Sequence, residues 1–394
     1  MIIGVDGNEA NTEKRVGVGQ YSLALLGFWQ KWANGENQFW VYLHGPANKK
    51  VLPPPQPYFS YFSFGPQKFW TQFALPAKLY FQKEKPNVFF SPAHYSPRFS
   101  PIPTVLTIHD LAFFYYPQEF KTRDLWQLKR WTAYSVKKAQ KIIAVSQNSK
   151  KDLIRFYRLP EEKISVVYNG YDRERFTPKK NKREIGRIRK KYQTGADYLL
   201  YVGTLQPRKN IISLIKAFPF ILNQDQRRRK TLKLVIAGKK GWLYENLFSA
   251  VRELKLTEKV VFTDFVPDED LPYLLSGAKL FVLPSLYEGF GLTALEAMAC
   301  GAPVLVSKNS SLPEVVGEAG LYLENPEDLQ EISQKVGQIL DNRDLAASLA
   351  KKGLEQAQKF SWEKCARQTL DLIQKNVIPE LNSGQALNLI QDYA

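Results

Sequence analysis

Short apolar runs alternate along the first half of the chain with longer amphipathic stretches. The runs are "MIIGVD", "QFWVYLHG", "NVFFSPA", "TVLTIHD", "KIIAVS" and "ISVVYNG", and each ends near Gly, Pro, Asn, Asp or Ser. Between them lie helix-length stretches such as "GVGQYSLALLGFWQKWA" and "DLWQLKRWTAYSVKKAQ". This alternation is typical of an α/β fold with a parallel, doubly wound sheet covered by helices.

The same rhythm restarts in the second half, after a charged segment at 173–197 that predicts a linker leading into a basic helix. Its apolar runs are "YLLYVGT", "LKLVIAG", "KVVFTDF", "KLFVLPS" and "PVLVS". A chain of 394 residues is long enough for two such domains. We therefore expect an N-terminal domain over 1–178, a C-terminal domain over 195–375, and a closing helical segment over 376–394 that packs back onto the first domain.

Composition narrows the class of protein. Hydrophobic residues make up 44% and charged residues 24%, a balance typical of globular chains. The net charge of +17 suits anionic partners, although solubility alone explains it equally well. Only two cysteines and three histidines are present, which indicates the cytosol and argues against a zinc site. No apolar run is long enough to span a membrane.

The stretch "PSLYEGFGLTALEAMACG" at 284–301 predicts a strand end, a glycine loop and a helix. Gly289 and Gly291 would let a ligand approach the backbone, and the N–H groups of Leu292 and Thr293 would bind an anion at the helix start. Glu288 and Glu296 would accept hydrogen bonds from the hydroxyls of a sugar and a ribose. The alternative is a solvated loop acid at 288 and an interaction of the acid at 296 with its own helix start.

A second motif, "YVGTLQPRKN", places two cations between a strand and a helix. Arg208 and Lys209 could hold a diphosphate, one as a fork and the other as a point charge, and Asn210 could cap the helix that follows. A solvated basic turn is the alternative.

The N-terminal domain offers weaker signals. "GVGQYS" carries Gly17 and Gly19 just before the predicted helix, as a phosphate-facing loop would, but a flexible turn fits equally well. "TVLTIHDL" places His109 at the end of a buried strand, where it could contact a substrate or serve as a hydrogen-bonded structural residue.

Two further patterns have an ordinary explanation beside a functional one. Asp268 and Asp270 could bind a divalent metal with a nucleotide, but helix capping is the better interpretation. The stretch "DLWQLKRWTAYSVKKAQK" mixes Trp126, Trp131 and Tyr134 with lysines and arginines. It could contact an anionic membrane, or it could be an ordinary helix with its aromatic residues in the core.

Taken together, these motifs resemble a retaining glycosyltransferase of family 4, group 1, with the GT-B fold. The resemblance rests on "SLYEGFGLTALEAMACGAPVLVS", "SSLPEVVGEAGLYL", "YVGTLQPRKN", "TIHDLAFFYYPQEF", "KIIAVSQNSKKDLI" and "ISVVYNGYD", which cover nearly the whole chain in the expected order. It is closest to bacterial mannosyltransferase-like members that assemble polysaccharides and lipopolysaccharides. The fold it implies consists of two Rossmann-like doubly wound domains that face an interdomain cleft.

The resemblance also implies roles for individual residues. It assigns catalytic positions to His109, Arg208, Lys209 and Glu288, and donor-binding positions to Gly17, Gly19, Gly289, Phe290, Gly291, Leu292, Thr293 and Glu296. Glu288 would contact the donor sugar and Glu296 the ribose, while the two cations would bind the diphosphate. The chain departs from many relatives at Thr204, where they carry arginine, and at Thr293, where they carry proline.

The activity implied is transfer of a hexosyl unit, mannose or glucose, from a GDP-mannose or UDP-glucose type donor to a hydroxyl of a glycan or lipid-linked acceptor. No cofactor, metal or nucleic-acid partner is expected. We expect a cytoplasmic protein with peripheral contact at the anionic inner face of the membrane. The alternatives are a nucleotide-sugar epimerase or a phosphorylase on the same fold, or a non-enzymatic basic protein that binds nucleic acid.

Overall fold

The computed structural model describes residues 1–13 and 15–377, and the chain forms two units. The first unit contains 1–111, 122–170 and the chain from 362 onward, and the second contains 112–121 and 171–361. The expected division placed one boundary near residue 180 and left the chain up to 375 in the second domain. In the structure the chain enters the second unit at 171 and leaves it at 361, and most of the expected closing segment, 376–394, lies outside the described residues.

The first unit is built on a seven-stranded sheet in the order β3-β2-β1-β4-β5-β6-β7, in which all neighbouring strands are parallel. Its strands are β1 (Ile2–Asp6), β2 (Gln38–Leu43), β3 (Phe59–Ser63), β4 (Val88–Ser91), β5 (Thr104–Ile108), β6 (Lys141–Ala144) and β7 (Ile164–Val166). The strand order reverses between β1 and β4, which makes this the switch point where ligands bind in open α/β sheets.

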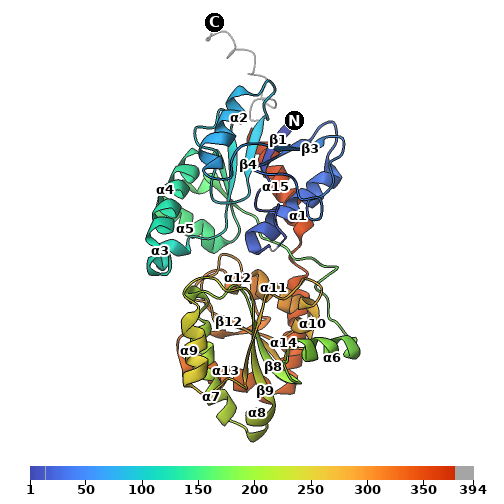
Figure 1. Ribbon diagram of the computed structural model, residues 1–394, viewed down its shortest axis with the longest axis vertical. Coiled ribbons are helices and arrows are strands. Elements are labelled where there is room, and N and C mark those ends of the chain that lie inside the picture. Colours follow the sequence, from blue (N-terminus) through green and yellow to red (C-terminus); the bar gives the residue numbers. More distant parts are fainter. Residues whose placement is uncertain (14, 378–394) are drawn as a thin grey trace. The chain divides into compact units, whose positions relative to one another are not determined.

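Helices cover both faces of this sheet, with α1 and α15 on one side and α4 and α5 on the other (Figure 1). The helical elements of the unit are α1 (Gly17–Trp32), the π-helix η1 (Trp70–Ala74), α2 (Leu75–Phe81), α4 (Thr122–Lys138), α5 (Gln147–Tyr157), η3 (Glu161–Lys163) and α15 (Trp362–Val377). In Figure 1 the red α15 lies beside the blue α1, near the start of the chain.

Helix α15 belongs to the first unit because its apolar face is buried there. Cys365, Ala366 and Ile373 lie in the same hydrophobic core as β1 and β2. The indole N–H of Trp29 donates to the carbonyl oxygen of Ala366 at 3.1 Å. The chain therefore returns to its N-terminal unit earlier than expected, at 362 rather than at 376.

The second unit has a six-stranded parallel sheet in the order β10-β9-β8-β11-β12-β13. Its strands are β8 (Asp197–Val202), β9 (Leu232–Ala237), β10 (Val260–Asp264), β11 (Leu280–Leu283), β12 (Val304–Ser307) and β13 (Gly320–Leu323). Here the order reverses between β8 and β11, so the second switch point lies beyond the carboxyl ends of these two strands.

Helices cover both faces of the second sheet as well, with α7, α9 and α13 on one side and α10, α11 and α14 on the other (Figure 1). The helical elements are α3 (Ala112–Tyr115), η2 (Pro117–Glu119), α6 (Lys182–Lys191), η4 (Pro207–Lys209), α7 (Ile211–Asn223), α8 (Gln226–Thr231), α9 (Glu245–Glu253), α10 (Leu271–Ser276), α11 (Leu292–Ala299), α12 (Leu312–Val316), α13 (Leu329–Asp341) and α14 (Arg343–Ala357).

Every apolar run named in the sequence forms a strand, and the doubly wound fold class is confirmed in both units. Two strands were not expected, and both lie at an edge of their sheet: β3 in the first unit and β13 in the second. β3 mixes aromatic residues with serine, and the two central side chains of β13 are only half-buried, so neither has the fully buried apolar run of a central strand. Within the described part of the chain, no helix combines the length and apolar composition needed to cross a bilayer.

Candidate active site

The switch point of the second sheet brings together the two motifs singled out in its sequence. The chain leaves β8 at Val202 and runs through the turn η4 into α7, and it leaves β11 at Leu283 and runs through a loop into α11. These loops are joined by a backbone hydrogen bond, because the N–H of Leu286 donates to the carbonyl oxygen of Arg208 at 2.8 Å. The cations of one motif are thereby held beside the first glutamate of the other.

Glu288 and Lys209 form a nearly buried ion pair at this point. The ammonium Nζ of Lys209 lies 2.6 Å from Oε1 of Glu288, and their side chains are only 13% and 10% exposed. The hydroxyl of Ser285 donates to the same oxygen at 2.8 Å. The backbone of Glu288 is fixed as well, since its N–H donates to the Ser310 hydroxyl at 2.9 Å. Glu288 is therefore positioned rigidly and is not a solvated loop acid.

Arg208 lies next to this pair. Its Nη1 approaches the carbonyl oxygen of Tyr287 at 3.5 Å, and its Nε approaches Oε1 of Gln206 at 3.4 Å. Burial raises the pKa of Glu119, on the segment 112–121, and the charge of Arg208 opposes that rise. Two cations and two carboxylates therefore share this edge of the sheet, and the guanidinium of Arg208 is half-buried among them.

Helix α11 begins as the sequence predicts, and its start is open to an anion. Gly291 has a φ of 102°, a left-handed conformation that favours glycine, and a Cβ there would lie 2.8 Å from Cδ2 of Leu312. No side chain caps the first turn, whose Leu292 and Thr293 are half-buried. Their N–H groups and the helix dipole make this end suited to negative charge.

Phe290, which the resemblance assigned to donor binding, lies between the two glycines of this loop. Its ring is buried and packs edge-on against Phe360, with ring centroids 5.7 Å apart. This contact anchors the loop between Gly289 and Gly291. The side chain itself is therefore part of the hydrophobic packing of the unit.

Glu296 is a half-buried carboxyl one turn into α11. The pKa of Glu296 is raised to about 8, chiefly by burial, while the charge of Arg175 lowers it and those of Asp268 and Asp172 contribute to the rise. A carboxyl held in this way lacks the compensation that ligand hydroxyls would supply to its ionised form. Its position fits the predicted role toward a ribose, which remains a prediction.

The capping interpretation of the two aspartates is wrong. Asp268 pairs with Arg175 at 2.7 Å. Asp270 occupies the N-cap position directly before α10, but its side chain does not cap the helix and accepts instead from Lys191 at 2.5 Å and from the Tyr192 hydroxyl at 2.7 Å. Cations from the 171–192 segment compete for these carboxylates more strongly than backbone N–H groups do. Within 1–13 and 15–377, no three His, Cys, Asp or Glu side chains lie together as a metal ion would need.

Asn210 also differs from its expected capping role. It has a left-handed φ of 53°, and its side chain does not cap α7. Its amide donates to the carbonyl oxygen of Pro326 at 2.6 Å, and its amide oxygen accepts from the Ser213 hydroxyl at 2.7 Å. The residue therefore fastens the start of α7 to a neighbouring loop.

In the first unit, His109 stands at the end of β5 as predicted. Its Nε2 lies 2.7 Å from the carbonyl oxygen of Pro92, so Nε2 must carry the proton of the neutral ring. The pKa of His109 is lowered to about 4, chiefly by burial and also by nearby His94. The ring also meets Tyr21 edge-on, with centroids 5.0 Å apart. His109 is thus a neutral, hydrogen-bonded residue near neutral pH.

The two glycines of "GVGQYS" lie inside α1, whereas the sequence predicted a loop before the helix. The helix begins at Gly17, and Gly19 falls in its first turn. A Cβ on Gly19 would lie 2.8 Å from the carbonyl oxygen of Glu9. The absence of a side chain therefore lets the segment after β1 pass closely over the helix start.

Helix α4 does not present its aromatic residues as one membrane-facing stripe. Trp126 is 56% exposed, but Trp131 is half-buried and meets Tyr95 edge-on at 5.5 Å between ring centroids. The hydroxyl of Tyr134 accepts from the backbone N–H of Phe99 at 2.7 Å. Two of the three aromatic side chains are therefore engaged within the unit.

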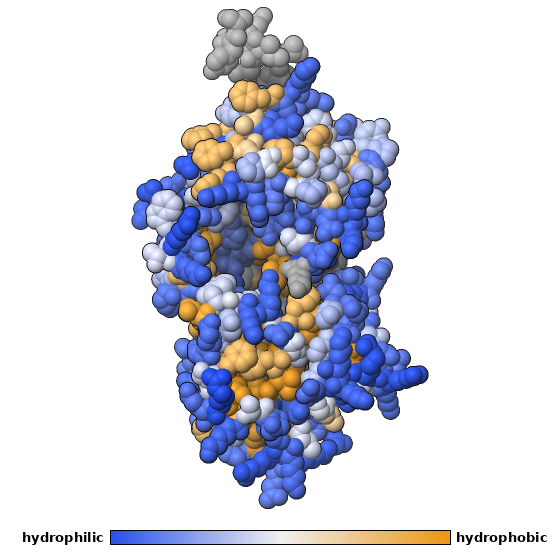
Figure 2. Space-filling model, in the orientation of Figure 1, coloured by the Kyte–Doolittle hydropathy of each residue, from blue (hydrophilic) through white to orange (hydrophobic). Residues whose placement is uncertain are grey.

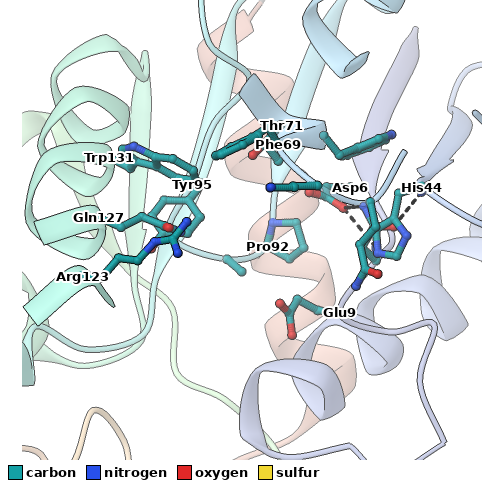
Figure 3. Close-up of a pocket in the computed structure, with 15 residues that line it drawn as sticks. Asp6, Glu9, His44, Phe69, Thr71, Pro92, Tyr95, Arg123, Gln127 and Trp131 are labelled. Carbon is teal, nitrogen blue, oxygen red and sulfur yellow. Dashed lines mark hydrogen bonds between the residues drawn. The ribbon is translucent and has the colours of Figure 1, made fainter. Parts of the chain in front are cut away.

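Sequence reasoning missed a pocket at the switch point of the first sheet. The pocket measures about 390 Å³, and Asp6, Glu9, His44, Tyr95, Gln127 and Trp131 are among the residues that line it (Figure 3). These side chains come from distant parts of the chain, so no single motif announces them. The signal available in the sequence was the polar segment "DGNEAN" directly after the first strand, at the edge where ligands bind.

Two family models match the chain. Residues 182–356 match the glycosyl transferases group 1, and residues 29–175 match the glycosyltransferase family 4. The two matches lie one after the other and leave uncovered the two ends of the chain and residues 176–181 between them. They agree with the order of the motifs in the two units.

Curated relatives point the same way. The chain is 37% identical to the O-antigen chain mannosyltransferase B of Escherichia coli over 268 residues, which are 68% of this chain and 69% of that protein. It is 31% identical to the serotype-specific mannosyltransferase WbdA of Escherichia coli over 63% of this chain, a match that spans only 30% of that longer protein.

Solved structures share the fold at low sequence identity. Sucrose-phosphate synthase from Thermosynechococcus elongatus matches with a TM-score of 0.74 and 22% identity, over 95% of this chain and 98% of that one. Anabaena HepE in complex with UDP-glucose matches with a TM-score of 0.72 and 19% identity, over 95% and 99%. The GT-B fold of two Rossmann-like domains is confirmed. The chain belongs to the group 1 glycosyltransferases of family 4 and is a glycosyltransferase.

Proposed function

We propose that this enzyme transfers a hexosyl unit from a nucleotide diphosphate sugar to an acceptor hydroxyl, with retention at the anomeric carbon. The observation that carries the proposal is the Lys209–Glu288 ion pair, 2.6 Å long and nearly buried, with Arg208 beside it at the second switch point. Adjacent cations and a fixed carboxylate at this edge suit a ligand that carries both a diphosphate and a sugar.

Positive charge for the diphosphate comes from three sources. Arg208 offers a planar fork of donors, Lys209 offers a point charge, and the uncapped start of α11 offers backbone N–H groups. As the bond to the sugar breaks, negative charge grows on the departing diphosphate. Groups already in place around it stabilise that charge without reorganisation, and this is the largest contribution to catalysis that the site can make.

The two glutamates divide the hydroxyls of the donor. Both hydrogen bonds described for the carboxylate of Glu288 reach Oε1. The other oxygen, Oε2, can accept from hydroxyls of the donor sugar. Glu296 accepts from the ribose, and this contact favours the ionised form of a carboxyl whose pKa is otherwise raised.

In this proposal the acceptor hydroxyl attacks the anomeric carbon on the same face from which the diphosphate departs, through an ion-pair-like transition state. The configuration at that carbon is therefore retained. No side-chain nucleophile is invoked, and the departing diphosphate takes the proton of the acceptor hydroxyl. Transfer proceeds without a metal or cofactor, since Arg208 and Lys209 supply the charge that a divalent cation supplies in other transferases.

The donor is of the GDP-mannose or UDP-glucose type, and the acceptor is a glycan or a lipid-linked glycan. Mannose is favoured by the relatives named as O-antigen mannosyltransferases, and glucose by the structure of HepE with UDP-glucose. Both remain proposals for this chain.

Peripheral contact with an anionic membrane is proposed through the surface around α2, in place of the aromatic residues of α4. Phe73, Phe81 and Phe99 are 71%, 86% and 66% exposed. Arg98 lies over the ring of Phe99, and Lys78, on α2, lies over the ring of Phe64. Hydrophobic residues gather on the surface where Figure 1 places α2, with hydrophilic residues around them (Figure 2). Exposed aromatics flanked by cations suit the boundary between headgroups and acyl chains.

This contact can be tested by sedimentation with vesicles. Vesicles rich in phosphatidylglycerol should retain the protein, and pure phosphatidylcholine vesicles should not. A Phe73→Ser/Phe81→Ser variant should lose retention, whereas Leu243→Ser, which changes an apolar residue of the second unit that is 57% exposed, should keep it. Equal retention of all three proteins would contradict the proposal.

The main experiment is a thermal-shift screen against GDP, UDP and ADP, followed by incubation with sugar donors of the nucleotide that binds. We expect one nucleotide to stabilise the protein and its donor to be consumed. NMR of the anomeric proton of the product tests retention, and EDTA tests metal independence. An inverted product, or activity abolished by EDTA and restored by a divalent metal, would overturn the corresponding part of the mechanism.

A further inference from the structure

The pocket of the first unit lies at its switch point, beyond the carboxyl ends of β1 and β4. Asp6 is the last residue of β1, and Pro92 directly follows β4. The remaining walls come from the 67–71 segment before and within η1, and from α4. At about 390 Å³ the pocket is within the range of sites that take small ligands.

The pocket has two walls of different chemistry (Figure 3). Trp131, Tyr95 and Gln127 lie on one side, and Asp6, Glu9 and His44 lie on the other, with Pro92 between them. The first wall offers the flat rings of Trp131 and Tyr95 beside the polar side chains of Gln127 and Arg123, while the opposite wall offers carboxylate oxygens. A pyranose has the same division, with apolar C–H faces and a rim of hydroxyls.

The aromatic wall is held rigidly. The ring of Trp131 meets that of Tyr95 edge-on at 5.5 Å and is tilted against that of Phe69 at 6.3 Å between centroids. Phe69 has a left-handed φ of 57° and is followed directly by the π-helix η1. A bulky residue in this conformation is strained, and both strain and π-helical turns are concentrated at ligand sites.

The charges around the pocket balance. Its ionisable lining consists of two carboxylates, Asp6 and Glu9, two cations, Lys68 and Arg123, and His44. Asp6 already accepts from the N–H and side-chain amide of Asn8, at 3.0 and 2.7 Å. A phosphate or sulfate in this pocket would face the two carboxylates. A neutral ligand with many hydroxyls can use acceptors and donors together.

The pocket is joined to the residues that the resemblance assigned to the active site of this unit. The carbonyl oxygen of Pro92 accepts from His109, and the carbonyl oxygen of Glu9 lies where a Cβ on Gly19 would meet it. A ligand in the pocket therefore contacts the same two backbone segments that fix these residues.

We propose that this pocket binds an uncharged hexose unit of the acceptor, with a face of the sugar against Trp131 and Tyr95 and its hydroxyls toward Asp6 and Glu9. The proposal deepens the proposed function and rests on it. The part of the acceptor that binds in this pocket is then a neutral glycan, and not a sugar phosphate or a lipid phosphate.

Saturation-transfer NMR with small glycosides tests this directly. The probes are methyl α-mannoside, methyl α-glucoside and mannobiose, with mannose 6-phosphate as the charged comparison. We expect transfer to at least one neutral probe and weaker transfer to the phosphate. Trp131→Ala should weaken binding about tenfold or more, because it removes the stacking face. Trp126→Ala changes an exposed tryptophan of the same helix and should have no effect.

Two further measurements keep the result interpretable. Glu9→Gln alters an exposed carboxylate without opening a cavity, so it should fold and still weaken glycoside binding. Calorimetry with UDP and GDP should give the parent affinity in Trp131→Ala, because the nucleotide-binding groups belong to the second unit. No transfer from any neutral probe, stronger binding of the phosphate, or equal binding by the Trp131 and Trp126 variants would overturn the inference. If the parent protein itself binds neither UDP nor GDP, the proposed function is overturned instead.

Discussion

The switch points of the two sheets are built by the same topology but carry opposite chemistry. In the second unit, Arg208, Lys209 and Glu288 gather in a nearly buried charged cluster supplied by two contiguous motifs. In the first unit, a charge-balanced pocket with an aromatic wall is assembled from separate segments. The strand order selects where ligands bind, and the side chains that line each edge select what binds.

The largest effect is expected from the charged cluster. Glu288→Gln and Arg208→Ala should each lower kcat by about 10³, because each removes a preorganised group from the transition state. Steady-state kinetics with the donor found in the screen measures this. The matched controls are Glu355→Gln and Arg227→Ala, which change exposed residues of the same unit. Variants that fold like the parent and keep full activity would break the assignment.

The start of α11 should be the next most sensitive point. Gly291→Ala introduces a Cβ at a φ of 102° and against Leu312, so it should destabilise the second unit by up to about 3 kcal/mol. Denaturant unfolding measures the change. Gly186→Ala in α6 is the comparison, since a Cβ there meets nothing within 4 Å, and it should be neutral or slightly stabilising.

Glu296 should trade stability for ligand binding. Its pKa is raised from 4.5 to about 8, so the folded state holds a proton that the unfolded state has lost, and stability falls as pH rises from 4.5 to about 8. Glu296→Gln removes this dependence and should stabilise the ligand-free protein by about 2 kcal/mol at pH 8. The gain should shrink toward pH 5, and thermal unfolding at both pH values measures it.

Binding by the same variant supplies a second readout. Nucleoside diphosphate affinity should fall about tenfold in Glu296→Gln, because an amide replaces a carboxylate that accepts from the ribose. Calorimetry at pH 8 measures this. A variant that is stabilised but binds nucleotide as tightly as the parent would remove Glu296 from the donor site.

The smallest effect is expected at the first switch point. The pKa of His109 is lowered from 6.5 to about 4. Between these pH values the unfolded state binds a proton that the folded state does not bind, so the stability of the fold falls as pH drops from 6.5 to about 4. His109→Gln does not titrate and can still donate to the carbonyl oxygen of Pro92. The free energy of unfolding of this variant should not depend on pH over this range. Between pH 7 and pH 5 its stability relative to the parent should therefore rise by about 1 kcal/mol. Parallel pH profiles would contradict a neutral His109.

The sequence predicted the site of the second unit better than that of the first. Arg208, Lys209 and Glu288 each follow a buried strand within a few residues, so the edge they share is set by parallel pairing of neighbouring strands. Local interactions were harder to predict. Asp270 and Asn210 occupy helix-start positions, yet side chains and backbone distant in the sequence claimed them. Whether a side chain caps a helix depends on which other hydrogen-bond partners the fold places beside it.

The sequence by itself determined the doubly wound class, the charged motifs and all strands of the two sheets except β3 and β13, because periodicity and strand ends are local properties of the chain. Only the tertiary structure decided that α15 returns to the first unit, that Lys209 pairs with Glu288, and that Trp131 faces Asp6 and Glu9 across a pocket. Each of these joins side chains from separate elements. These contacts depend on how whole helices and strands pack together, and local sequence patterns do not determine that packing.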